Sequence, residues 1–155
     1  MLNKNFKDML NALNDSGVEY LLVGAHAIAF YAAPRATGDI DIWIRPTREN
    51  AARVWDALAR FGAPRRKLKL DDLCTADNVY QIGVAPNRID ILTSISGVEF
   101  EAAWASKTPS QLDDVPVNII GRNELLQNKR ACGRPKDLAD IASLEHRDHL
   151  KGGSN

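Results

Sequence analysis

The sequence of 155 residues has little cysteine, with Cys74 and Cys132 alone and no CxxC pair. A disulfide framework and a cysteine-based zinc site both lack material, so we expect a reducing, cytoplasmic setting. Charge of one sign is also missing, because 20 basic residues balance 20 acidic ones. A net charge of zero argues against a protein that coats duplex nucleic acid by charge alone.

Long apolar runs are absent as well. The longest, residues 20–33, contains Gly24 and His26 and is too short to span a bilayer. Lys4 and Lys7 lie where a secretion signal would be apolar, so we expect neither a membrane association nor export. The GxGxxG and GxxxxGK[ST] motifs are missing too, which leaves dinucleotide binding of the Rossmann type and P-loop hydrolysis without support.

The composition itself is that of a folded globular protein, with 45% hydrophobic and 26% charged residues. At this length we predict a single domain over residues 1–150, with a core over 19–93, C-terminal helices over 122–149 and a disordered tail over 151–155.

Hydrophobic periodicity predicts a mixed α/β order of elements. The uninterrupted run 20–23 is typical of a central strand, and a glycine turn at Gly24 leads from it into an alanine-rich helix. In the last helix, Leu138, Ile141 and Leu144 are expected on the packed side. The segment 65–76 is expected to be a loop. The predicted helices are 2–15, 25–33, 47–61, 99–105 and those beginning at 122 and 135, and the predicted strands are 39–44, 79–84, 88–93 and 115–119.

Three aspartates on predicted strands are the strongest functional signal. Asp39 and Asp41 are two residues apart, so their carboxylates point to the same face, and a neighbouring strand could place Asp90 beside them. Grouped carboxylates repel one another unless a hard cation neutralises them, which predicts Mg²⁺, with two ions and Mn²⁺ as a substitute. The pair alone is also typical of a solvated strand face.

The turn at Gly24 is a candidate phosphate site. Free backbone N–H groups at the start of the following helix, at Gly24 and Ala25, attract an anion, and a glycine permits close approach. A plain tight turn explains Gly24 equally well. Arg35 and Thr37 precede the aspartate pair and fit either a phosphate contact or a solvated loop. Lys129 or Arg130 fits either a triphosphate contact or a helix surface.

These residues resemble those of the DNA polymerase β-like nucleotidyltransferases, in particular small prokaryotic members associated with toxin–antitoxin and abortive-infection systems. The resemblance covers residues 19–93 and rests on Val23-Gly24-Ala25, on 34–44 and on 88–92; a weaker match continues over 129–140. It implies a mixed sheet flanked by helices.

By position, the resemblance implies that Gly24 with Ala25 binds the triphosphate, that Asp39 and Asp41 bind the metal ions, and that Asp90 helps to activate the acceptor hydroxyl. Ala25 departs from the family pattern, because it lacks the hydroxyl of a serine and keeps only its backbone N–H.

Other residues have simpler interpretations. His26 is expected to be a packed side chain rather than a catalytic one, and Trp43 to fill space on the sheet rather than to stack on a base. The basic residues of segment 65–69 suit a solvated loop better than a nucleic-acid contact.

The predicted function is Mg²⁺-dependent transfer of a nucleotide monophosphate from an NTP such as ATP to a hydroxyl of a protein or an RNA. The alternatives are a catalytically weak antitoxin or binding partner, and an RNA-binding module that uses 65–69. A cognate toxin or antitoxin and a second copy of the chain are both open as partners.

Overall fold

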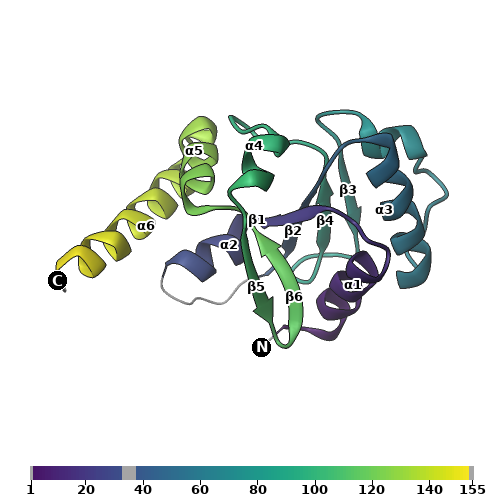
Figure 1. Ribbon diagram of the computed structural model, residues 1–155, viewed down its shortest axis with the longest axis horizontal. Coiled ribbons are helices and arrows are strands. Elements are labelled where there is room, and N and C mark those ends of the chain that lie inside the picture. Colours follow the sequence, from purple (N-terminus) through teal and green to yellow (C-terminus); the bar gives the residue numbers. More distant parts are fainter. Residues whose placement is uncertain (1, 33–37, 154–155) are drawn as a thin grey trace.

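The computed structural model describes the backbone of residues 2–32 and 38–153, and side chains as far as residue 146. The helices and strands alternate in the predicted mixed order (Figure 1). In chain order they are α1 Lys4–Asp15, β1 Tyr20–Val23, α2 Gly24–Tyr31, β2 Ile40–Ile44, α3 Arg48–Phe61, the 3₁₀ helix η1 Leu70–Cys74, β3 Val79–Ile82, β4 Ile89–Leu92, α4 Phe100–Ala105, β5 Thr108–Leu112, β6 Val115–Ile119, α5 Arg122–Cys132 and α6 Pro135–Gly153.

The strands form one six-stranded mixed sheet in the order β3-β4-β2-β1-β6-β5. All four residues of β1 are buried, as expected of an apolar strand with neighbours on both sides. β1 runs antiparallel to β2 and parallel to β6, whereas β2 runs parallel to β4. The candidate residues Asp41 on β2 and Asp90 on β4 therefore lie on adjacent strands that point the same way.

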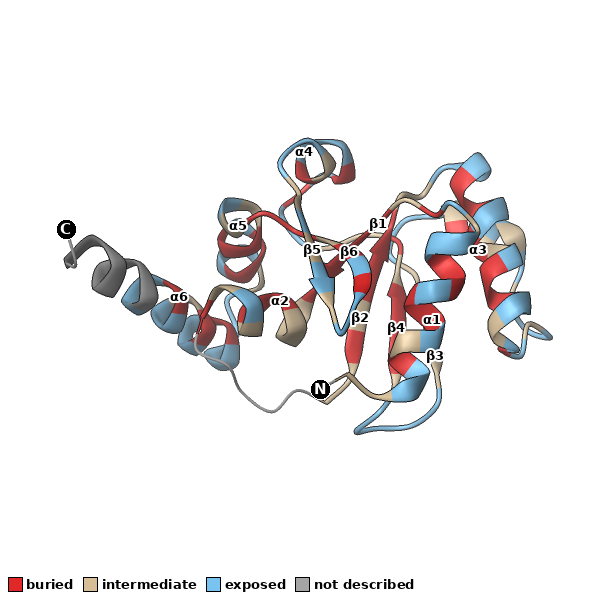
Figure 2. Ribbon diagram, turned by 60° about the horizontal axis from the view of Figure 1, so that its bottom comes forward, coloured by how far each residue is buried: buried red, intermediate tan, exposed pale blue. Residues whose placement is uncertain are grey.

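Helices cover the sheet from two ends of the molecule. α1 and α3 pack against one another at one end, and α2, α5 and α6 group at the other (Figures 1 and 2). Buried residues concentrate on the central strands and on the inner faces of α1 and α3 (Figure 2). None of the helices in the described part of the chain is long and apolar enough to cross a membrane.

Local sequence signals explain several element ends. The side chain of Asn3 accepts a hydrogen bond from Phe6 N at the start of α1, and that of Thr47, the predicted cap, accepts one from Asn50 N at the start of α3. Gly62 ends α3 with a left-handed backbone, at φ 88°.

The structure corrects four predictions. A strand that the sequence pattern does not reveal, β5, pairs with β6 at the edge of the sheet, and η1 lies inside the expected loop 65–76. α6 continues to Gly153, so residues 151–153 are helical rather than part of a disordered tail; 154 and 155 lie outside the described residues. Leu138 is exposed, whereas Asp137 and Asp140 are buried beside Leu144.

Candidate functional site

Parallel pairing of β2 and β4 brings two of the predicted aspartates together. Asp41 lies directly opposite Asp90 in the register, although 49 positions separate them in the sequence (90 − 41). Asp90 is buried and Asp41 is half-buried. Two carboxylates on directly opposed positions of paired strands, both partly withdrawn from water, repel one another. This repulsion favours a bound proton or a bound cation.

The glycine turn touches the same pair. Val23 at the end of β1 lies opposite Asp41, so Gly24 follows at the Asp41 carboxylate. A Cβ at Gly24 would overlap Asp41 Oδ2 and lie 3.0 Å from Asp41 Cγ, and the φ of Gly24 is +67°. Both the close approach and the left-handed backbone require glycine here.

The electrostatics of Asp41 reflect this crowding. Burial, followed by the charge and hydrogen bonding of Asp90 and the charge of Asp39, raises the pKa of Asp41 to about 6, and Lys129 acts in the opposite direction. The anionic charge of the group is therefore only partly compensated, which is the condition that a divalent cation relieves.

Arg88 compensates the other two aspartates. Its Nε and Nη2 donate to Asp90 Oδ1 and Oδ2 at 2.7 and 3.1 Å. The same Nη2 lies 3.2 Å from Asp39 Oδ2, and the backbone N of Arg88 donates to Asp39 Oδ1 at 2.9 Å. Asp39 and Asp90 are thus held together by one residue rather than facing open solvent.

α5 and α6 supply the opposite wall. The Nζ of Lys129, whose side chain is 9% exposed, lies 3.3 Å from Asp137 Oδ1 and 3.3 Å from Asp140 Oδ2. Arg134 also binds Asp137, donating from Nε to Oδ2 at 2.6 Å and from its backbone N to Oδ2 at 3.1 Å. These bonds, with that of Arg134 first, lower the pKa of Asp137 to about 2. The network fixes Lys129 at the wall.

A cleft of about 450 Å³ lies between these elements. Six of the eight predicted site residues line it, whereas Arg35 and Thr37 lie outside the described residues. The cleft residues are Gly24, Ala25, Asp39, Asp41, Arg88, Asp90, Lys129, Arg134, Lys136 and Asp140.

The sequence analysis did not assign four of these residues to the site: Arg88, Arg134, Lys136 and Asp140. Arg88 carried a usable signal, because it shares a strand face with Asp90 two residues later. The other three depend on how α5 and α6 fold back over the sheet, which their local pattern does not encode.

The cleft offers oxygen donors of the kind that a divalent ion prefers. Asp39, Asp41 and Asp90 offer the carboxylate oxygens that Mg²⁺ prefers. Among the side chains that the structure describes, however, no group of three acidic, histidine or cysteine residues is arranged to hold a metal ion. The donors fit in kind, and Arg88 contacts the oxygens of two of them, Asp39 and Asp90.

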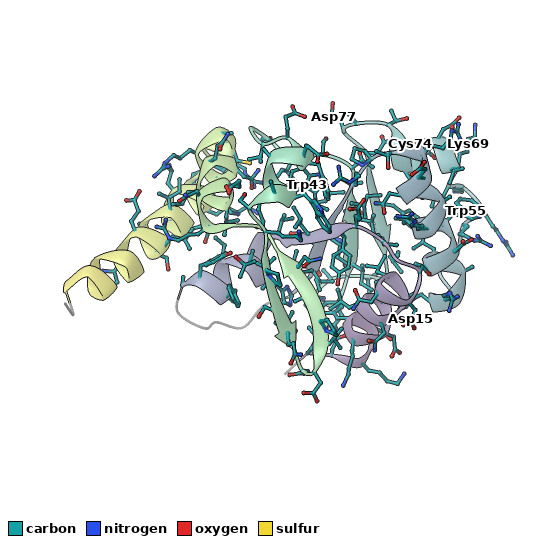
Figure 3. All side chains as sticks on the ribbon, in the orientation of Figure 1. Asp15, Trp43, Trp55, Lys69, Cys74 and Asp77 are labelled. Carbon is teal, nitrogen blue, oxygen red and sulfur yellow. The ribbon has the colours of Figure 1, made fainter. Side chains whose placement is uncertain are left out.

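The remaining candidates lie apart from the cleft or have structural roles. Trp43 is 1% exposed and packs edge-on against Phe100 at 5.0 Å, so it fills space and is unable to stack on a base (Figure 3). His26 packs edge-on against Phe6. Burial lowers the pKa of His26, and a hydrogen bond with the backbone of Asp39 partly offsets this effect. Arg130 pairs with Glu145 on the exposed side of α5.

The basic segment 65–69 lies at the end of the molecule that carries α3, away from α5 and α6, as the labelled Lys69 and its neighbour Trp55 show (Figure 3). Arg65 stacks over the Trp55 ring, with its Cζ 4.6 Å from the centroid. This segment is remote from the carboxylates, and the stacking gives Arg65 a structural role.

Comparisons with known proteins bear on the fold. No family model and no curated protein sequence matches the chain. Among solved structures, a candidate nucleotidyltransferase from Thermotoga maritima superposes with a TM-score of 0.60 at 13% identity, covering 88% of both chains. The lincosamide antibiotic adenylyltransferase LnuA, bound to lincomycin, superposes with a TM-score of 0.60 at 15% identity, covering 94% of this chain and 97% of its own. The chain therefore shares the fold of these two nucleotidyltransferases, a six-stranded mixed sheet with flanking helices, as the resemblance to the polymerase β-like nucleotidyltransferases implied.

Proposed function

We propose that residues 1–150 form a Mg²⁺-dependent nucleotidyltransferase domain that moves a nucleotide monophosphate from an NTP to a hydroxyl and releases pyrophosphate. One arrangement carries the proposal. Asp41 and Asp90 lie opposite one another on parallel strands, and Gly24 lies so close to the Asp41 carboxylate that a Cβ would overlap it. A solvated strand face needs neither the burial of Asp90 nor this close approach.

Each side of the cleft has a role in this reaction. The first N–H groups of α2, which include those of Gly24 and Ala25, are not capped by a side chain and would donate hydrogen bonds to phosphate oxygens of the nucleotide. Lys129 on the opposite wall adds positive charge, as do Arg134 and Lys136 at the rim. The triphosphate would therefore be held between α2 and the α5–α6 connection.

Chemistry then depends on position and charge. The acceptor oxygen forms a bond to the α-phosphorus while the bond to the pyrophosphate oxygen breaks, and Asp90 supports removal of the hydroxyl proton. Asp39, Asp41 and Asp90 are the residues that would hold the divalent ions. When bound, such ions activate a hydroxyl and stabilise a leaving phosphate oxygen.

The family resemblance extends the proposal to the acceptor and the setting. A hydroxyl on a protein or an RNA is the acceptor that the small prokaryotic members suggest, and a toxin–antitoxin or defence system is their setting. LnuA carries an antibiotic in its structure, so a small-molecule hydroxyl belongs in the same acceptor screen.

The direct test incubates the protein and Mg²⁺ with each labelled NTP and with total cellular RNA, total protein or small alcohols. We expect label to reach one acceptor class, and Asp41→Asn to remove the transfer because it lacks an anionic oxygen at the ion site. Asp71→Asn, in an exposed pair with Arg48 far from the cleft, is the matched control and should keep full activity. Transfer that persists in Asp41→Asn would refute the assignment.

A second candidate, a binding partner without turnover, is favoured by one observation: Arg88 already neutralises Asp39 and Asp90. Calorimetry separates the two functions. For an enzyme, the heat of binding of a non-hydrolysable NTP analogue should depend on Mg²⁺. A partner protein that never binds nucleotide should give no heat that depends on the metal.

A further inference from the structure

The guanidinium of Arg88 uses the carboxylate oxygens that a metal ion would need. Arg88 Nε and Nη2 take the two oxygens of Asp90, and Nη2 with the backbone N of Arg88 takes the two oxygens of Asp39. Side-chain exposure is 10% for Asp90 and 24% for Asp39, so water has limited access to these oxygens. A forked donor on a buried carboxylate is a strong, charge-assisted interaction.

The other cations of the cleft do not duplicate this contact. Lys129 lies against Asp137 and Asp140, and Arg134 lies against Asp137. Among the described residues, Arg88 is therefore the basic residue that pairs with both Asp39 and Asp90.

The side chain of Arg88 is also free to rotate away from the two aspartates. Its side chain is 30% exposed, on a residue at the cleft edge just before β4 begins, so rotation of its side chain requires no movement of the sheet. Because one carboxylate oxygen cannot hold both a guanidinium and a metal ion in the same direction, ion binding at Asp90 and the Arg88 fork compete.

We propose that Arg88 is a stand-in cation: it holds Asp39 and Asp90 together in the metal-free chain and is displaced when a divalent ion binds. This inference rests on the proposed function, since it concerns regulation of the same site. Arg88 acts as a positioning residue, and the released guanidinium, a bidentate partner for phosphate, is left at the mouth of the cleft that receives the nucleotide.

The test measures Mn²⁺ binding from the electron paramagnetic resonance signal of the free ion, at about pH 7.5 and without nucleotide. Arg88→Gln should bind Mn²⁺ about tenfold more tightly than the unaltered protein, because the competing charged hydrogen bonds are gone. Arg130→Gln, which removes an exposed arginine paired with Glu145, is the matched control and should leave the affinity unchanged.

A second measurement uses the unaltered protein and so does not depend on how the variant folds. Nitrogen-15 NMR should show the Arg88 Nε–Hε resonance shifting as Mg²⁺ is added, while that of Arg130 stays in place. Equal or weaker binding in Arg88→Gln, or an Arg88 resonance that stays fixed while Mg²⁺ binds, overturns the inference and leaves the proposed function intact if label transfer is observed. Absence of both ion binding and transfer overturns the two together.

Discussion

At the scale of single residues, the site is a balance between repulsion and compensation. Asp41 meets Asp90 across the strand pair, and Gly24 lets the chain pass close to its carboxylate. Arg88 neutralises Asp39 and Asp90, whereas burial and the charges of these two aspartates raise the pKa of Asp41. The folded chain therefore disfavours ionisation of Asp41, whose pKa is raised to about 6.

This cost predicts a pH-dependent gain of stability in Asp41→Asn. The pKa of Asp41 is raised from 3.8 to about 6, so the folded chain binds this proton more tightly than the unfolded chain. The resulting stabilisation is complete below pH 3.8 and is lost as the pH rises through about 6. Asparagine cannot ionise, so metal-free Asp41→Asn should be more stable by about 3 kcal/mol at pH 7.5.

Urea unfolding in the presence of a chelator, at about pH 4.5 and about pH 7.5, measures the effect. The advantage of Asp41→Asn should shrink toward the lower pH. Asp71→Asn removes an exposed carboxylate and should show no such trend. A gain in Asp41→Asn that is equal at both pH values would contradict the assigned cause.

At the scale of elements, buried charge joins the last two helices. Asp137 is 0% exposed and Asp140 8% exposed on the inner face of α6, where the apolar pattern had placed Leu138. Lys129 of α5 lies between the two acids. An ionic network thus takes the position expected for an apolar side chain, because a buried lysine requires anionic partners.

Breaking this network should loosen the helices much more than breaking an exposed pair. Asp137→Asn removes the negative charge that Lys129 and Arg134 share, so we expect a loss of about 3 kcal/mol in unfolding free energy. Glu145→Gln on the same helix breaks its exposed pair with Arg130 and should cost about 0.5 kcal/mol or less. Chemical denaturation of both variants provides the comparison, and equal losses would contradict the structural role of Asp137.

β5 illustrates why one strand escaped the sequence pattern. Its residues alternate between intermediate and exposed, with none buried, and Pro109 lies within it. An edge strand tolerates proline because one of its sides carries no ladder. Asp113 and Asp114, with φ values of 45° and 70°, turn the chain into β6. The segment is a strand because its backbone pairs with β6, and not because it buries an apolar face.

At the scale of the whole molecule, the cleft lies between parts that are far apart in the sequence. α2 and the central strands form one side, and α5 and the start of α6 form the other. A nucleotide with its ion would contact both sides at once. A ligand that binds the folded chain but not the unfolded chain raises the free energy of unfolding by mass action.

We therefore expect an NTP analogue with Mg²⁺ to raise the unfolding temperature. At about 100 times the dissociation constant the gain is about 2.7 kcal/mol, which corresponds to about 5–10 °C for a chain of this size. Differential scanning fluorimetry with each NTP analogue, with and without a chelator, measures the shift. The shift should vanish on chelation and in Asp41→Asn, and a shift that is independent of Mg²⁺ would contradict metal-assisted binding.

The sequence by itself determined the features that depend on local geometry. Alternation of period two identified β2 and β4 and placed Asp39 with Asp41, and the apolar run before Gly24 identified the central strand and its turn. Helix caps such as Thr47 were legible for the same reason, since they join residues three positions apart.

Only the tertiary structure decided which of these residues meet. The register that sets Asp41 opposite Asp90, the fork from Arg88 to Asp39 and the enclosure of Lys129 by Asp137 and Asp140 all join elements brought together by packing. Periodicity states which face a side chain occupies, whereas its partner depends on strand register and on how helices fold back over the sheet.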